Sequence, residues 1–505
     1  MKLVKLIKNL SVIKNNINEM IDDIEVSSIH YSSQYVKPGG VFIAIKGLKS
    51  DGHNYIEHAI KNGAVAIISE KSIKSDCIII QVKDSREALS EISEEFYGKP
   101  SQDLFIIGIT GTNGKTTVTY ILENILTEAG YKVGVIGTIN CRYDGKIMKS
   151  PVTTPESMDL QKILADMKQN GVTHVVMEIS SHAIDLKRIH NCFIDVGIFT
   201  NLSQDHLDYH KTMEAYWQSK KRLFTEQMGK GCKKNKACTV INMNDSKGTE
   251  LQNSLTMPVI TVGTLNNCMI NTSDITFDQS GTKGKIIINK ESFIFQSKLV
   301  GKHNLENILC AVGAADSMGL SKDIIKKGIE SFAIVPGRLE PINNSKGRFI
   351  YVDYAHTPDA LENVLKTLKG ISPKKIICVF GCGGDRDSKK RPLMGKIAGE
   401  LSDFAIITSD NPRTEDPLNI ILNIEDGIKS VMTKKYNEND ISMELSEKGY
   451  IIESDRKKAI YLAVKIAKSG DTILIAGKGH ENYQILGNNT IDFDDRIYAK
   501  EAINQ

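Results

Sequence analysis

The stretch LFIIGITGTNGKTT, residues 104–117, decides the fold of this chain. An apolar run stops at glycines and is followed at once by Lys-Thr-Thr, which is typical of a strand, a phosphate-binding loop and a helix. Glycines at 111 and 114 allow backbone N–H groups to turn toward phosphate oxygens. Lys115 is placed to reach the outer phosphates, and the hydroxyl of Thr116 is placed to ligate Mg²⁺. The sequence therefore predicts a phosphate site at the N-terminus of a helix.

The loop is a variant of the usual G-x-x-x-x-G-K-[ST] pattern, because the first glycine would fall on Ile109. A plain glycine turn between a strand and a helix is the alternative, but Lys-Thr behind two glycines serves no obvious packing purpose. Helical spacing of apolar residues continues the motif, with Gly130 as the predicted stop. These residues are Val118, Ile121, Leu122, Ile125, Leu126 and Ala129.

Length and composition frame the rest of the chain. The 505 residues predict about three domains. A net charge of +3 from 64 basic and 61 acidic residues argues against a nucleic-acid arm or a polybasic membrane segment, and favours small acidic ligands. The nine cysteines lack zinc-like or C-x-x-C spacing and predict free thiols in a reducing compartment. No run of eighteen apolar residues and no signal-like N-terminus occur, so we expect a cytoplasmic protein.

Apolar runs alternate with helical patterns along the whole chain, which predicts an α/β protein with mainly parallel sheets. We expect three domains: a small N-terminal α/β domain over 1–100, a central domain over 101–336, and a C-terminal α/β domain over 337–505. The predicted strands are 41–45, 64–69 and 77–82; 133–138, 174–179 and 196–200; and 349–354, 375–381, 404–409 and 472–477. Residues 270–300 alternate like further strands, and a helix opens after Gly301.

Polar residues follow each predicted strand, where ligands of parallel sheets gather. Glu178 ends a strand and could hold a metal at the phosphate site, as strand-end carboxylates do in nucleotide hydrolases. Ser180, Ser181 and His182 are more often a hydrogen-bonded turn than a catalytic triad. A lone His206 is by default a loop histidine. Two α/β domains with facing loops predict a cleft with nucleotide on one wall and a second substrate on the other.

A set of motifs then resembles the Mur ligases across all three units and in order. The motifs are GITGTNGKTT, TTPES, MEISSHA, NLSQDHLDYH, YWQSKKRLF, GKHNLENI, PGRLE, VDYAHTPDAL, GCGGDRDSKKRP, DNPRTEDP and GKGHENYQ. Within that family the chain is most similar to the MurE type. The resemblance implies a UDP-sugar-binding first domain, a P-loop ATPase-like central domain and a Rossmann-like, amino-acid-binding third domain.

The resemblance also implies the reaction and its cofactors. ATP would phosphorylate a carboxylate of UDP-N-acetylmuramoyl-L-alanyl-D-glutamate, and the amine of an incoming amino acid would attack the acyl phosphate, in peptidoglycan precursor synthesis. The protein would mainly position charged partners and neutralise phosphate charge. The positions that resemble ATP-binding residues of the family are Gly111, Thr112, Asn113, Gly114, Lys115, Thr116, Thr117, Asn304, Asn307, Arg338, Asp353 and His356.

Metal and catalytic roles carry over by motif. Thr116 and Glu178 would hold one Mg²⁺ and His206 a second, while Lys115, Glu178, His206 and Lys220 would be catalytic. Lys220 matches the lysine that is carbamylated in the family, so that a carboxylate faces the metals. Without the motif, a solvated helix lysine would be the simpler interpretation.

Substrate-binding roles carry over in the same way. Thr153, Thr154, Ser180 and Arg188 match positions that hold the UDP-sugar. Ser33 matches a uridine-proximal serine, but Ser32 and Gln34 replace the usual Asp and Arg beside it, which puts the details of UDP recognition in question. The positions that resemble amino-acid-binding residues are Arg386, Asp410, Asn411, Pro412, Arg413, Gly477 and Glu481.

The DNPR motif, residues 410–413, bears on specificity. An Asx-Pro turn would explain its first three residues but does not need Arg413. A guanidinium is a planar fork suited to a carboxylate, and meso-diaminopimelate differs from lysine by one carboxylate. DNPR resembles the diaminopimelate-adding type, and Glu481 suits an ammonium. L-lysine as the added residue is the nearest alternative.

Two further alternatives lie outside this reaction. Folylpolyglutamate synthase shares the fold and chemistry, but the UDP-binding-like first unit and DNPR argue against it. A nucleotide-dependent switch without ligase activity would not require the second metal's ligands or an amino-acid site. We expect a monomer without nucleic-acid or membrane partners.

Overall fold

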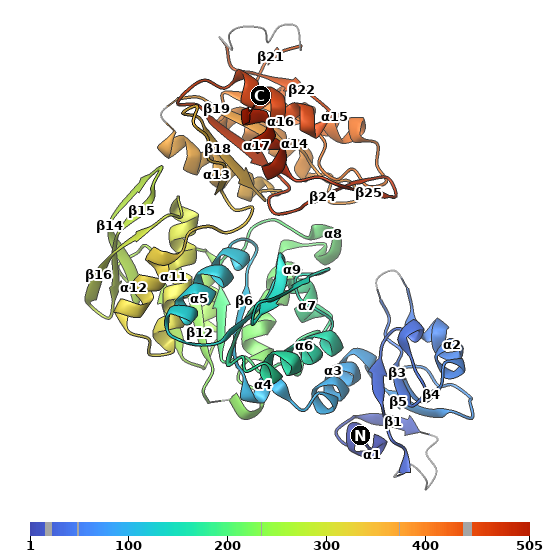
Figure 1. Ribbon diagram of the computed structural model, residues 1–505. Helices are drawn as coiled ribbons and strands as arrows, with labels where there is room; N and C mark the ends of the chain where they lie inside the picture. The colour runs from blue at the N-terminus through green and yellow to red at the C-terminus, as the bar shows by residue number, and fades with distance from the viewer. Residues whose placement is uncertain (16–22, 48–49, 234, 373, 438–446, 505) are drawn as a thin grey trace.

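The computed structural model describes residues 1–505 except 16–22, 48–49, 234, 373, 438–446 and 505. Figure 1 shows three bodies that follow one another in chain order, from blue through green and yellow to red. Each body is built on its own sheet, and these sheets lie within residues 12–82, 105–297 and 340–476. The predicted α/β class is confirmed, while the domain boundaries at 100 and 336 stay predictions.

The N-terminal body carries a five-stranded sheet in the order β1-β5-β4-β3-β2. Strands β2 to β5 are parallel, and β1 is antiparallel to β5. Helix α3 then carries the chain to the central body and packs against α6 there. The elements are α1 (Leu3–Ile7), β1 (Val12–Asn15), β2 (Ser28–His30), η2 (Ser33–Tyr35), β3 (Gly40–Ile43), η3 (Gly52–Tyr55), α2 (Ile56–Lys61), β4 (Ala64–Ser69), β5 (Ile78–Val82) and α3 (Ser85–Phe96).

The central body carries an eleven-stranded sheet in the order β16-β15-β14-β13-β12-β11-β6-β10-β7-β8-β9. Its elements up to the middle of the sheet are α4 (Pro100–Asp103), β6 (Phe105–Thr110), α5 (Lys115–Glu128), β7 (Val133–Ile136), β8 (Asn140–Tyr143), β9 (Lys146–Lys149), α6 (Ser157–Gln169), β10 (His174–Glu178), α7 (Ser181–Asp185) and β11 (Val196–Phe199). The remaining elements are α8 (Leu207–His210), α9 (Met213–Arg222), η4 (Leu223–Gln227), η5 (Gly231–Lys233), β12 (Cys238–Asn242), α10 (Lys247–Asn253), β13 (Val259–Val262), β14 (Ile270–Asp278), β15 (Gly281–Ile288), β16 (Glu291–Ser297), α11 (Lys302–Ser317) and α12 (Lys322–Ser331).

The loop that opened the sequence analysis lies between β6 and α5, at the centre of this sheet. Strand β6 is parallel to β10 on one side and to β11 on the other. Helix α5 begins directly after Gly114, whose φ is +88°, and buries its apolar face against α11 and α12. It ends before Gly130, which has a φ of +84° as a helix stop requires. The predicted strand, loop and helix are therefore confirmed.

The C-terminal body carries a seven-stranded sheet in the order β17-β18-β23-β19-β20-β22-β21, parallel except for β17. A separate hairpin, β24–β25, lies at the end that faces the central body in Figure 1. The elements are β17 (Glu340–Pro341), β18 (Phe349–Asp353), α13 (Pro358–Ile371), β19 (Ile376–Phe380), α14 (Lys390–Leu401), β20 (Phe404–Ile407), α15 (Pro417–Ile428), β21 (Lys434–Lys435), β22 (Gly449–Ile452), α16 (Arg456–Ile466), β23 (Thr472–Ala476), β24 (Tyr483–Leu486), β25 (Asn489–Asp492) and α17 (Asp495–Asn504).

The sequence analysis missed one antiparallel edge of the central sheet, and also the parallel strands β12 and β13. The β8–β9 hairpin extends one edge, and its outer strand is fully exposed, so it carries no buried apolar run. The β14–β16 meander extends the other edge, where residues 270–300 were predicted as strands. All nine cysteines are free thiols, as predicted. Among the described residues, no helix has the length and apolar character needed to span a membrane.

Candidate active site

The phosphate loop lies at the carboxyl ends of β6 and β11, with backbone geometry that only glycine allows at two positions. Gly111 has a φ of +148°, and a Cβ there would collide with the Thr200 hydroxyl. A Cβ on Gly114 would collide with the Asn307 side-chain oxygen. Lys115 Nζ donates to the carbonyls of Gly111 and Thr112, at 2.8 Å each. The loop is thus closed by its own lysine and backed by Asn307 of α11.

Glu178, at the end of β10, lies directly beside this loop. Its side chain is buried, and both carboxylate oxygens accept from the Thr116 hydroxyl, at 3.0 and 3.1 Å. Thr138 donates to the same carboxylate from its backbone N–H and from its hydroxyl, at 2.9 Å each. The strand-end position of Glu178 therefore places it as the sequence suggested. Thr138 was not predicted, although it also follows a strand end.

The donor set around Glu178 fits a Mg²⁺ ion. Thr116 and Thr138 give their protons to the carboxylate, which leaves hydroxyl lone pairs for a hard cation. Within the part of the chain that the structure describes, no cluster of three or more His, Cys, Asp or Glu side chains is arranged to hold a metal. A Mg²⁺ site usually contains only one or two protein carboxylates, and water and substrate phosphates complete the octahedral coordination.

Lys220 of α9 points into the same region and is 1% exposed, which rules out the solvated-lysine interpretation. Its Nζ donates to the Gly111 carbonyl at 2.7 Å, the oxygen that also accepts from Lys115. The ammonium lies 4.4 Å from the centre of the Tyr216 ring. Burial lowers the pKa of Lys220 well below its usual value, and the nearby Lys115 lowers it further. Two lysine side chains therefore donate to one carbonyl in a buried site.

His206 lies at the start of α8 with a φ of +55° and a partly exposed ring. Its Nε2 is 3.4 Å from Asp205 Oδ2, and its ring contacts the edge of His182. Burial lowers the pKa of His206 to about 4, although the negative charge of Asp205 acts to raise it. The imidazole is therefore neutral near pH 7 and able to donate a lone pair to a metal.

The C-terminal body closes the other side of the loop. The guanidinium of Arg338 lies 3.5 Å from Thr116 Oγ1 and 4.6 Å from the centre of the Tyr354 ring. Its buried Nε has no hydrogen-bond partner among the described residues. Asp359, at the start of α13, accepts from the Asn113 side chain at 2.7 Å, which links the phosphate loop to the C-terminal body directly.

The remaining predicted nucleotide residues have structural partners of their own. Asp353 is buried and accepts from the N–H groups of Leu339 and Ala355, at 2.6 and 2.7 Å. His356 directs Nδ1 to the Tyr354 carbonyl at 2.8 Å. Asn307 donates to Asn304, which donates to the Val300 carbonyl. These two hydrogen bonds hold Asn307 against Gly114 of the phosphate loop. Thr112 and Thr117 are buried in the loop and the first turn of α5.

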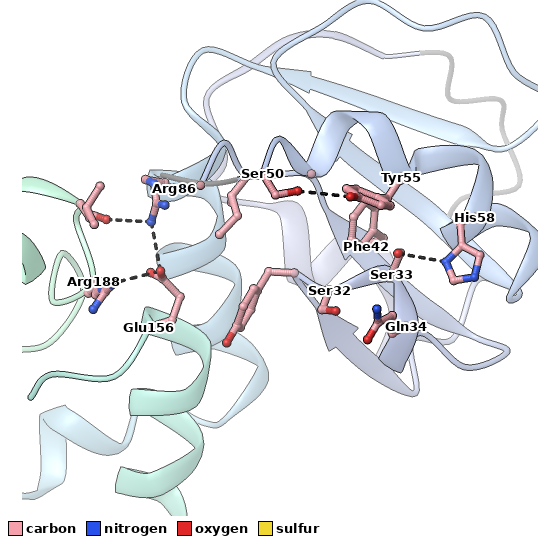
Figure 2. A pocket seen from close by; sticks show the side chains of 15 residues that line it. Ser32, Ser33, Gln34, Phe42, Ser50, Tyr55, His58, Arg86, Glu156 and Arg188 are labelled. Atoms are coloured by element: carbon pink, nitrogen blue, oxygen red, sulfur yellow. Dashed lines mark hydrogen bonds and ion pairs between the residues drawn. The ribbon is translucent and has the colours of Figure 1, made fainter. Parts of the chain in front are cut away.

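A cavity of about 930 Å³ lies between the N-terminal and central bodies. Figure 2 shows Ser33 pointing toward His58, and its Oγ lies 3.0 Å from the His58 Nδ1. Across the cavity, Arg86 reaches Glu156 at 3.1 Å, and Arg188 lies 3.4 Å from the same carboxylate oxygen. Ser32 and Gln34 also line this cavity. It therefore offers neutral hydrogen-bonding groups at one end and two guanidinium groups at the other.

The predicted sugar-binding residues connect this cavity to Glu178. Arg188 donates to the Thr154 carbonyl at 3.0 Å, and the Thr154 hydroxyl donates to the Glu178 carbonyl at 2.8 Å. The Thr153 hydroxyl lies 3.1 Å from that of Thr138. Ser180 caps α7 by accepting from the Ala183 N–H, so the Ser-Ser-His trio is the hydrogen-bonded turn considered above.

The predicted amino-acid residues gather at the carboxyl ends of β20 and β23. The Asn411 side chain donates to Glu481 at 2.9 Å and accepts from the Ile485 N–H at 3.0 Å, so it bridges distant loops instead of closing an Asx-Pro turn. Gly477 lies against the Asp410 carboxylate. A Cβ on Gly384 would collide with the Pro412 carbonyl, so that carbonyl fixes the neighbouring loop.

The Arg413 guanidinium lies beside these residues and is held by a backbone carbonyl. Its φ is +53°, and its guanidinium donates to the Gly384 carbonyl at 2.8 Å. Within the described chain no carboxylate oxygen lies within ion-pair distance of it, although Asp385 is near enough for Arg413 to lower its pKa. Arg386 is exposed on the same loop as Gly384. Sequence reasoning missed Lys478, which is fully buried and contacts Asn411 and Glu481.

Comparison with known proteins gives three family models that together cover most of the chain. They are the Mur ligase family catalytic domain over residues 25–97, the Mur ligase middle domain over 109–315 and the Mur ligase glutamate ligase domain over 337–479. The chain is 45% identical to the UDP-N-acetylmuramoyl-L-alanyl-D-glutamate–2,6-diaminopimelate ligase of Geobacter metallireducens, over 95% of each chain. It is 40% identical to the ligase of that name from Caldanaerobacter subterraneus, over 100% of this chain and 99% of the relative.

Comparison with solved structures finds the same three-domain fold. A structure of a ligase with the same name is 32% identical, with a TM-score of 0.68 and coverage of 97% of this chain and 96% of the other. MurF from Acinetobacter baumannii has the same fold at 17% identity, with a TM-score of 0.65 over 95% and 94% of the two chains.

Three α/β bodies, with a phosphate loop at the centre of the middle sheet, match the architecture of an ATP-dependent ligase. The chain belongs to the Mur ligase family.

Proposed function

We propose that the protein joins meso-diaminopimelate to UDP-N-acetylmuramoyl-L-alanyl-D-glutamate, with ATP and Mg²⁺, as a step of peptidoglycan precursor synthesis. The relatives that carry this name cover nearly the whole chain. Arg413 is the observation that carries the choice of amino acid. A guanidinium held by a carbonyl and left without a carboxylate is prepared for the second carboxylate of diaminopimelate. L-lysine would leave that charge unpaired.

ATP supplies the phosphoryl group that activates the substrate carboxylate, and Mg²⁺ offsets its charge. Gly111 to Thr117 bind the phosphates, and Thr116 and Glu178 hold one Mg²⁺. His206, neutral near pH 7, and the carbamate of Lys220 serve a second. Arg338 approaches Thr116 from the C-terminal body, so closure of that body brings a cation to the reacting phosphate.

The three bodies divide the substrates among them. Ser33, Thr153, Thr154, Ser180 and Arg188 bind the UDP-sugar peptide between the first and second bodies. Asp410 to Arg413, Gly477, Glu481 and Arg386 bind the amino acid on the third. The free thiols favour a reducing compartment, so the proposal places the protein in the cytoplasm, as a monomer.

Phosphate release by the purified protein tests the function. The assay contains ATP, Mg²⁺ and UDP-N-acetylmuramoyl-L-alanyl-D-glutamate, with meso-diaminopimelate, L-lysine or no amino acid. We expect release that depends on meso-diaminopimelate and a tripeptide product detected by mass spectrometry. Lys115→Met is the control for contaminating ATPase activity, because it removes the phosphate-loop cation.

Each other outcome selects a different function. Preference for lysine would refute the role of Arg413 while leaving the reaction intact. Glutamate addition to a folate without use of the UDP-sugar peptide would favour a folylpolyglutamate-synthase-like activity. Phosphate release that ignores every amino acid would favour a nucleotide switch.

Ser33→Ala tests UDP-sugar recognition in the first body. Because Ser33 Oγ is fixed by His58 at 3.0 Å and lines the cavity, we expect the variant to lose a hydrogen bond to the substrate. The expected result is a KM for the UDP-sugar peptide about tenfold higher. The KM for ATP should stay unchanged. Ser27→Ala, an exposed serine of the same body, is the matched control. An unchanged KM for the UDP-sugar peptide would place uridine elsewhere.

A further inference from the structure

Three side chains of the amino-acid cluster form a closed ring of hydrogen bonds, here called the Lys478 triangle. Lys478 Nζ donates to Asn411 Oδ1 at 3.2 Å and to Glu481 Oε2 at 3.1 Å. Asn411 Nδ2 donates to the same Glu481 oxygen at 2.9 Å. Lys478 and the Ile485 N–H both donate to Asn411 Oδ1, so together they fix which end of the Asn411 amide is the acceptor and turn its Nδ2 toward Glu481. The triangle therefore sets the orientation of two predicted ligand-binding residues at once.

The charge of the cluster is also set by Lys478. Its side chain is completely buried, and its Nζ lies 3.6 Å from Asp410 Oδ1 in addition to Glu481. One ammonium thus faces two carboxylates, which leaves a net negative charge on this side of the site. Asp410 Oδ1 is buried and has no hydrogen-bond partner among the described residues. An orphaned carboxylate oxygen of this kind is ready for a donor from a ligand.

We propose that Lys478 is a positioning residue of the amino-acid site: it holds Glu481 and Asn411 in place and offsets one of two carboxylates, so that the other charge binds the substrate ammonium. Lys478 itself has no exposed surface and does not touch the substrate. The inference rests on the proposed function, since it assumes that an amino acid binds here.

Other charged and titratable groups surround Glu481 and bear on its protonation. They are Asp410 after β20, Tyr354 after β18, Arg456 of α16 and Tyr483 of β24. Burial and Asp410 raise the pKa of Glu481, and Lys478 opposes both. Without Lys478 the carboxylate takes up a proton at higher pH than in the wild type, and protonated Glu481 cannot pair with an ammonium.

Lys478→Met tests the proposal through the KM for each substrate. We expect the KM for meso-diaminopimelate to rise at least about tenfold, because a buried charge loses its partner. The KM values for ATP and the UDP-sugar peptide should not change. The variant's KM for the amino acid should also keep falling with rising pH up to a higher pH than in the wild type, as Glu481 regains its charge. Lys465→Met, an exposed lysine on α16, is the matched control.

A second variant tests the role of Lys478 if Lys478→Met does not fold. In Lys478→Met/Glu481→Gln one unbalanced carboxylate is gone, so its Tm should exceed that of the single variant. A folded single variant with an unchanged KM and pH profile overturns the proposal, as does a double variant no more stable than the single one. If the wild type shows no dependence on an amino acid, the proposed function fails instead.

Discussion

Lys220→Met should lower kcat by at least about 10²-fold to 10³-fold while the protein stays folded, because this is the usual cost of removing one charge-stabilising group from an active site. Lys220 lies against the phosphate loop, where its Nζ donates to the Gly111 carbonyl, so we expect it to lie beside the reacting phosphates of ATP. Methionine fills a similar volume and removes a desolvated amine. The Tm should therefore not decrease.

The lowered pKa of Lys220 is a physical reason to expect that this lysine becomes carbamylated. A depressed pKa leaves the amine neutral at a pH where an exposed lysine is protonated. The neutral nitrogen attacks the carbon of CO₂, the N–H proton leaves to solvent, and a carbamate remains. The negative charge of the carbamate would also lie near the Lys115 ammonium, because both lysine side chains contact the Gly111 carbonyl. Carbon-13-labelled bicarbonate should give a carbamate signal in the wild type and none in Lys220→Met.

Lys221→Met is the matched control, because Lys221 follows Lys220 on α9 but points to Glu250 at the surface. Its activity should equal that of the wild type. Full activity of Lys220→Met would show that this buried lysine has a structural role only.

Arg413→Ala should weaken the use of meso-diaminopimelate selectively. A charge-assisted, forked contact with a carboxylate is worth about 1.5–3 kcal/mol, so we expect the KM for meso-diaminopimelate to rise about tenfold to a hundredfold. The KM values for ATP and the UDP-sugar peptide should stay constant, because Arg413 lies on the third body only. Steady-state kinetics with each substrate varied in turn measures the effect.

Backbone strain must be separated from loss of the guanidinium. Arg413 has a φ of +53°, a conformation that alanine adopts less readily than asparagine. Arg413→Asn keeps the backbone preference and removes the charge, so it should show the same rise in KM. Arg413→Lys keeps the charge but not the fork and should fall between the two. An unchanged KM for meso-diaminopimelate in both neutral variants would refute the assignment.

Local patterns in the sequence determined the parts of the fold that depend on neighbours along the chain. The strand before Gly111, the helix over 115–128 and its stop at Gly130 follow from apolar spacing and from glycine backbone freedom. Buried parallel strands are continuous apolar runs, so most of the strands in the middle of each sheet were predicted, although β12 was not. The exposed strand β9 carries no such run and was missed.

Only the tertiary structure decided which side chains meet. Thr138 and Glu178 are brought together by the pairing of β7 with β10, and Lys478 meets Asn411 because β20 and β23 end at the same edge. No spacing along the chain encodes these contacts. The same holds for Lys220, whose sequence context of three basic residues indicates solvent exposure, although α9 buries it against the loop. Burial and charge pairing depend on long-range packing, and they set the chemistry of this site.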